Sequence, residues 1–194
     1  MPVKTWIGSE LNPMDGLFTL NEACLSEIEN ALCLIRDNPL PLLMLHPSNF
    51  YMPKCKELIN TVFDCLENGF GFCLLDRLPL EDMTDNEAKS IYWLLSQMLG
   101  RPVAQKWCDG RMLYSVTDLG RPSGNGVRPD VTNEEQSFHT DNSYNICPPN
   151  IVGLLCLQPS MSGGLSRVVN MKTVLERMET SNKTNIQRLY RPFV

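Results

Sequence analysis

Apolar residues recur every three or four positions in three stretches of the first hundred residues, which is the spacing of one face of an α-helix. This spacing predicts helices at 21–36, 53–68 and 84–99. The predicted buried positions are Cys24, Ile28, Leu32 and Ile35 in the first helix, Leu58, Ile59, Val62 and Leu66 in the second, and Ile91, Leu94, Leu95 and Met98 in the third.

The residues at the expected helix ends agree with these boundaries. Pro53 suits a first helical position, where its missing N–H costs nothing, and Gly69 and Gly100 suit helix ends. Thr84 followed three residues later by Glu87 is the spacing of a capping box.

The pattern changes after Gly100, where short apolar segments alternate with Gly, Pro and Asn. It predicts strands at 111–116, 136–141, 150–159 and 164–170, in addition to a short buried strand within 69–79. Residues 118–136 read as a long exposed loop, and 171–179 as a last helix. Helices followed by strands favour an α+β fold with an antiparallel sheet.

Composition excludes several classes of protein. The chain has 17 Lys and Arg against 22 Asp and Glu, a net charge of −5, which argues against binding to nucleic acid. No apolar run approaches the roughly 18 residues of a membrane span, and the N-terminus lacks a signal-peptide pattern. We therefore expect a cytoplasmic protein that does not enter membranes.

The eight cysteines do not form a CxxC motif, and His46 and His139 are the two histidines of the sequence. This excludes zinc-finger spacing. Because most of the cysteines lie in apolar runs, such as Cys73 and Cys156, we expect buried, reduced thiols.

His139 and Asp141 are two positions apart in a predicted strand, so their side chains should point to the same face. An imidazole and a carboxylate side by side supply two ligands of the 2-His-1-carboxylate triad of non-haem Fe(II) oxygenases. Alone, the pair is more typical of a surface histidine with an acidic neighbour.

The surrounding sequence resembles the TauD/TfdA (taurine dioxygenase-like) family of Fe(II)/2-oxoglutarate-dependent dioxygenases over about residues 60–194. In that family an aromatic residue and a proline follow H-T-D, and an apolar strand leads to P-x-x-x-G-G-x-[ST]. The matching residues here are Tyr144, Pro148 or Pro149, Pro159, Gly163, Gly164 and Ser166. The two glycines would form a tight turn in which positive φ angles are easily adopted.

The resemblance implies a role for each matching residue. His139 and Asp141 would bind Fe(II), and the Ser166 hydroxyl would donate a hydrogen bond to the distal carboxylate of the co-substrate 2-oxoglutarate. Asn142 and Tyr144 would lie near the substrate. The implied fold is a partial double-stranded β-helix (jelly roll) of the clavaminate synthase-like type, preceded by helices. We expect one incomplete domain, with a mainly helical part at 1–100 and the first half of the jelly roll at 101–194.

The family also uses a second, distal histidine and, beyond it, an arginine that holds 2-oxoglutarate. No histidine follows His139, and Arg188 and Arg191 come too early to be that arginine. His46 lies far upstream in a proline-rich stretch, where a structural or surface role is expected. We therefore expect a C-terminally truncated member that alone binds Fe(II) weakly and turns over negligibly.

Two functions stay open. The first is oxidation of a C–H bond in a small, acidic or amino-acid-like metabolite. Oxidation is favoured over halogenation because related halogenases have a small residue where Asp141 stands. The second is a non-catalytic fragment or interaction module that keeps part of the fold. A cupin-type binding protein is less favoured, since cupins supply more histidines from clustered motifs. The oligomeric state is not encoded in any of these patterns.

Overall fold

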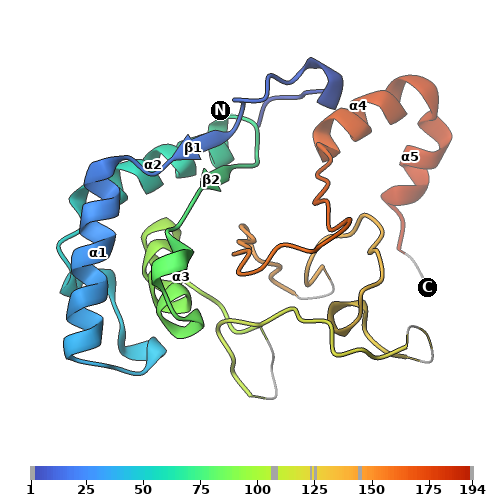
Figure 1. Ribbon diagram of the computed structural model, residues 1–194. Coiled ribbons are helices and arrows are strands. Elements are labelled where there is room, and N and C mark those ends of the chain that lie inside the picture. The colour runs from blue at the N-terminus through green and yellow to red at the C-terminus, as the bar shows by residue number, and fades with distance from the viewer. Residues whose placement is uncertain (1–2, 106–108, 123, 125, 144–145, 193–194) are drawn as a thin grey trace. The chain divides into compact units, whose positions relative to one another are not determined.

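The computed structural model describes residues 3–105, 109–122, 124, 126–143 and 146–192 (Figure 1). They form two compact units, one from the residues up to Leu99 together with those from Val168 onward, and one from Gly100 to Arg167. The single incomplete domain expected from the sequence stays a prediction. No helix within the described ranges is long and apolar enough to cross a membrane.

Three helices make up the core of the first unit, and all three are where the sequence predicts them (Figure 1). They are α1 (Glu22–Asp37), α2 (Pro53–Asn68) and α3 (Asp85–Leu99), and each packs against the other two. The four predicted positions of α1 are buried, as are those of α3. In α2, Leu58 and Leu66 are only half-buried, because the apolar face is centred on Cys55, Ile59 and Val62.

A two-stranded sheet pairs the segment before α1 with the segment between α2 and α3. Strand β1 (Leu17–Thr19) pairs in parallel with β2 (Leu74–Asp76), and Leu17 lies opposite Leu74. The strand predicted within 69–79 is therefore confirmed. The prediction that this strand is buried is wrong, because Leu74 is 60% exposed. The sheet is also parallel, whereas an antiparallel sheet was expected. No sequence pattern indicated that β1 would be the partner of β2.

Short 3₁₀ turns and two C-terminal helices complete the regular structure. Helix α4 (Met171–Ser181) confirms the predicted last helix, and α5 (Lys183–Leu189) follows it unforeseen. The 3₁₀ turns are η1 (Gly8–Glu10), η2 (Leu42–Met44), η3 (Pro47–Asn49), η4 (Leu80–Asp82) and η5 (Pro129–Val131).

Helix α4 is tied to the N-terminal segment of the same unit. Asn170 caps α4 by accepting the Thr173 N–H at 2.9 Å, and its side-chain amide donates to the Lys4 carbonyl at 2.8 Å. The Thr173 hydroxyl lies 3.1 Å from the Trp6 backbone N and 3.0 Å from the Trp6 carbonyl. Asn170 is buried, so these bonds are shielded from water.

The start of α2 is capped by a carboxylate from α1. Glu27 accepts the backbone N–H of Lys54 through Oε1 and that of Cys55 through Oε2, both at 2.9 Å. Pro53, the first residue of α2, has no N–H to satisfy. One side chain therefore binds two otherwise unpaired donors at the positive end of the helix dipole.

We expect Glu27→Ala to lower the free energy of unfolding by about 1 to 2 kcal/mol, since it removes both caps at once. Urea denaturation followed by circular dichroism measures the change. Glu29→Ala, an exposed position on the same helix, is the control and should lie within about 0.5 kcal/mol of wild type. Equal losses in the two variants would contradict the capping role.

The start of α3 shows the predicted capping box. The Thr84 N–H donates to Glu87 Oε2 at 2.7 Å, and the Glu87 N–H donates to the Thr84 hydroxyl at 3.3 Å. Arg36 Nε of α1 adds an ion pair to Glu87 Oε1 at 2.6 Å. The Arg36 hydrogen bond, followed by the bonds from Thr84, lowers the pKa of Glu87 from 4.5 to about 2.

This shift predicts a pH dependence of stability. The pKa of Glu87 is lower in the folded chain, so its contribution is complete above about pH 4.5 and is lost as the pH falls toward 2. Urea denaturation of wild type and Glu87→Gln should give curves that differ at neutral pH and converge across this window. A difference that does not change with pH would contradict the assignment.

The second unit contains no strand among its described residues, and η5 is their only regular element. The segments 111–116, 136–141 and 150–159 are irregular, as is 164–170, which extends into the first unit. These strand predictions are wrong for the described residues, because a strand needs a ladder of backbone hydrogen bonds to a neighbour. The bond from the Gln105 N–H to the Arg111 carbonyl, at 2.6 Å, is a single contact and not a ladder. The jelly roll accordingly stays a prediction.

Candidate metal site

His139 and Asp141 are in contact in the second unit. His139 Nε2 lies 3.3 Å from Asp141 Oδ1, and each side chain is about half exposed, at 50% and 48%. The other ring nitrogen, Nδ1, lies 2.7 Å from the Ser137 carbonyl oxygen. The two side chains thus point to the same side of the backbone, although their segment is not a strand.

The contact with Ser137 determines which nitrogen of His139 is available. A carbonyl oxygen can only accept a hydrogen bond, so Nδ1 carries a proton and donates it. In the neutral ring, Nε2 then has a free lone pair directed at a carboxylate oxygen. Two such electron-rich atoms side by side can act together as ligands of one metal ion.

The distance between these two atoms suits a metal ion. Ligands about 2.1 Å from an ion and at a right angle to each other lie about 3 Å apart, close to the observed separation. Metal-binding histidines usually donate their other N–H to a backbone carbonyl or carboxylate, as His139 does here. The donor set therefore fits two adjacent positions of an iron site.

The other predicted site residues are only partly placed. Asn142 follows the pair in a left-handed turn with φ of 51°, a conformation that asparagine tolerates. Tyr144 lies outside the described residues. Ser166 is exposed. An ion pair of 3.1 Å between Arg167 Nη2 and Glu135 Oε1 brings the Ser166 segment beside the segment that leads into His139.

The glycine turn before Ser166 is present as predicted. Gly163 and Gly164 have φ angles of 74° and 67°, which other residues rarely adopt. The Ser160 hydroxyl donates to the Gly163 carbonyl at 3.0 Å, and a Cβ on Gly164 would collide with the Ser160 side chain. The turn thus requires glycine at its second position for space as well as for conformation.

The loop predicted at 118–136 is closed by contacts that the sequence did not reveal. The Leu119 N–H donates to the Val131 carbonyl at 3.0 Å, and Arg128 Nε pairs with Asp130 at 2.9 Å. Burial raises the pKa of Asp130, but hydrogen bonds from Tyr114 and Arg128 outweigh it and hold the pKa below its usual range. Asp130 therefore stays ionised and anchors the base of this loop.

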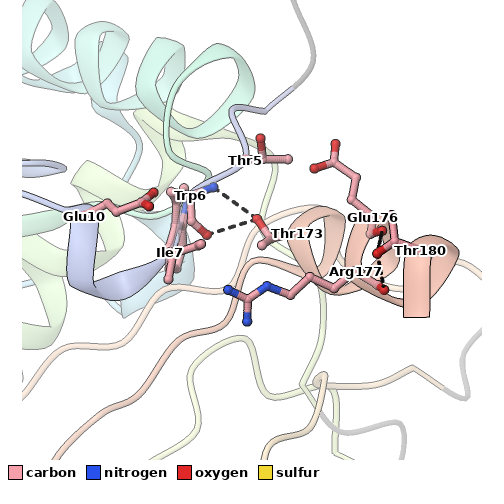
Figure 2. A pocket seen from close by; sticks show the side chains of 8 residues that line it. All are labelled: Thr5, Trp6, Ile7, Glu10, Thr173, Glu176, Arg177 and Thr180. Atoms are coloured by element: carbon pink, nitrogen blue, oxygen red, sulfur yellow. Dashed lines mark hydrogen bonds between the residues drawn. The ribbon is translucent and has the colours of Figure 1, made fainter. Parts of the chain in front are cut away.

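A shallow groove of about 300 Å³ lies elsewhere, in the first unit. Figure 2 shows it between the N-terminal segment and α4, with Arg177 on one wall and Trp6 and Ile7 on the other. None of the residues predicted for iron or co-substrate lines it. It gives no support to the site inferred from the sequence.

Comparison with known proteins identifies the family. Residues 44–194 match the family described as "Taurine catabolism dioxygenase TauD, TfdA family". The chain belongs to this family. It is also 29% identical over 149 residues to FR-33289 synthase of Streptomyces rubellomurinus (strain ATCC 31215). That match covers 76% of this chain and 42% of the relative, so the matched region spans less than half the length of that protein.

Members of the TauD/TfdA family use Fe(II) and 2-oxoglutarate, and the residues present fit part of that requirement. Among the described residues there is no cluster of three or more His, Cys, Asp or Glu that could hold a metal ion. His46, the other histidine, is in the first unit, where its Nδ1 caps η3 by accepting the Ser48 N–H at 3.2 Å. The structural role expected for His46 agrees with this contact.

Proposed function

We propose that this chain carries part of the active site of an Fe(II)/2-oxoglutarate-dependent oxygenase. His139 Nε2 and an oxygen of Asp141 would hold the iron from adjacent positions. The observation that supports this most directly is the 3.3 Å contact between two atoms with free lone pairs, with Nδ1 already committed to the Ser137 carbonyl. Bound iron, with 2-oxoglutarate and oxygen, would supply the oxidising chemistry.

Ser166 is our candidate for positioning the co-substrate. Its hydroxyl would donate to the distal carboxylate of 2-oxoglutarate, a charge-assisted bond. The Gly163–Gly164 turn changes the direction of the chain just before Ser166. The Arg167–Glu135 ion pair then keeps the Ser166 segment beside the residues that precede His139. Asn142 and Tyr144 would face the substrate.

The reaction class follows from Asp141. A carboxylate at this position would fill the place that halogenases of the same kind leave open for halide. We therefore propose hydroxylation, desaturation or a related C–H oxidation. The relative is named a synthase, which is compatible with action on a small metabolite. We propose that the substrate of this protein is small and acidic or amino-acid-like. We also propose that the protein is cytoplasmic.

An anaerobic calorimetric titration of Fe(II) into the 194-residue chain tests the proposal. We expect weak binding at one site, because the sequence supplies two of the three protein ligands. His139→Ala should reduce the affinity at least about tenfold, the effect typical of disturbing a metal site. His46→Ala, which removes the other histidine, should leave it unchanged. Fe(II) binding that survives His139→Ala would refute the proposal.

A second titration distinguishes this function from a non-catalytic interaction module. If 2-oxoglutarate binds the iron and Ser166 together, adding it should strengthen Fe(II) binding, and Ser166→Ala should reduce that gain. An affinity for Fe(II) that 2-oxoglutarate does not alter would favour the interaction module. An in-frame histidine and arginine encoded downstream of Val194 would favour the enzyme.

A further inference from the structure

Two cysteines converge where α2 ends and β2 begins. Cys65 Sγ lies 3.7 Å from the Phe72 carbonyl, and Cys73 Sγ lies 3.6 Å from the Val62 carbonyl. Phe72 precedes Cys73, and Val62 is one helical turn before Cys65, so each thiol donates to a carbonyl beside the other. Cys65 is also close enough to Cys73 to contribute to the raised pKa of Cys73.

The backbone between them is folded back tightly. The Cys65 carbonyl accepts the N–H of Gly69 at 3.0 Å and that of Gly71 at 3.3 Å. A Cβ on Gly69 would lie 2.7 Å from the same carbonyl, so only glycine fits there. The approach of the two sulfurs is thus built into the helix end and does not depend on a long, adaptable loop.

A second pair of cysteines provides an internal comparison. Cys55 Sγ lies 3.5 Å from the Cys24 carbonyl, and both residues are 0% exposed. Cys65 and Cys73, in contrast, are partly exposed. The chain therefore holds two close thiol pairs that differ in whether a small solute can reach them.

We propose that Cys65 and Cys73 form a reversible disulfide when the protein meets hydrogen peroxide, and that this pair is a site of oxidative modification. The balance is two thiols and one peroxide giving one disulfide and two water molecules. Both sulfurs are oxidised and both peroxide oxygens are reduced. The proposal does not depend on the iron site, which lies in the other unit.

The environment of the pair sets the order of the steps. Burial, followed by the interaction with Cys65, raises the pKa of Cys73 to about 12, so Cys73 stays protonated at neutral pH. The Cys65 sulfur therefore attacks the peroxide, the O–O bond breaks, water leaves and a sulfenic acid forms. The Cys73 sulfur then displaces the hydroxyl of that acid, which leaves as water with the Cys73 proton, and the S–S bond forms.

Peptide mapping of the full chain after peroxide treatment tests the proposal. A glutamyl endopeptidase cuts after Glu67, which separates Cys65 from Cys73 unless a disulfide joins them. We expect a linked peptide containing both, which disappears on reduction, while Cys24 and Cys55 stay alkylatable after unfolding. Oxidation of the exposed Cys33 shows that the peroxide dose was sufficient.

Two single variants test the order of steps. Cys73→Ser should leave Cys65 as a sulfenic acid that dimedone traps, and Cys65→Ser should leave Cys73 as a free thiol. The proposal is overturned if Cys65 and Cys73 both remain alkylatable at a dose that oxidises Cys33. It is equally overturned if Cys24 and Cys55 become linked to the same extent, because accessibility would then not select the pair.

Discussion

Leu94→Ala is expected to lower the free energy of unfolding by about 3 kcal/mol, within the usual range of 2 to 5 for a buried leucine. Leu94 is 0% exposed in α3, the helix that packs against both α1 and α2. Truncation would remove its apolar contacts and leave a cavity that three mutually packed helices cannot easily close. Urea denaturation monitored by circular dichroism measures the loss.

Leu34→Ala is the matched control for this experiment. Leu34 is a leucine in a helix of the same unit, but it is 49% exposed. Its removal should cost less than about 1 kcal/mol, because little apolar surface returns to water. Similar costs for the two variants would show that the three helices do not form the core of the folded chain.

Asp141→Ala is expected to weaken Fe(II) binding at least about tenfold, since it removes the charged member of the proposed two-ligand site. The carboxylate also attracts the cation electrostatically, so Asp141→Asn should recover only part of the affinity. Anaerobic titration calorimetry measures both variants.

Glu134→Gln is the control for Asp141. It removes one negative charge from an exposed side chain in the same unit and should leave Fe(II) affinity within about twofold of wild type, as expected for a screened surface charge. Equal losses for Asp141→Ala and Glu134→Gln would mean that general surface charge, and not coordination, attracts the metal.

The helices could be predicted because their determinants are local. The burial of Cys24 and Ile28, the Pro53 start and the Thr84–Glu87 box each depend on residues within one or two helical turns. The caps that join separate elements were not predictable in this way. Glu27 reaches α2 from another helix, and no spacing in the sequence indicates that contact.

Strands are harder to predict because they depend on partners distant in the sequence. Leu17–Thr19 was missed since three residues give little alternation, and the segment at 150–159 is apolar yet has no strand partner among the described residues. The same reasoning applies to the site. The contact between His139 and Asp141 follows from a spacing of two, whereas the relation of Ser166 to that pair depends on tertiary structure.

The bridge from Glu27 to the start of α2 also links the folding of two helices. If α1 unwinds, the Lys54 and Cys55 amides lose their shared acceptor, and the first turn of α2 opens to solvent. These two amides should therefore exchange with deuterium at the rate set by the opening of α1, so the two helices behave as one cooperative unit.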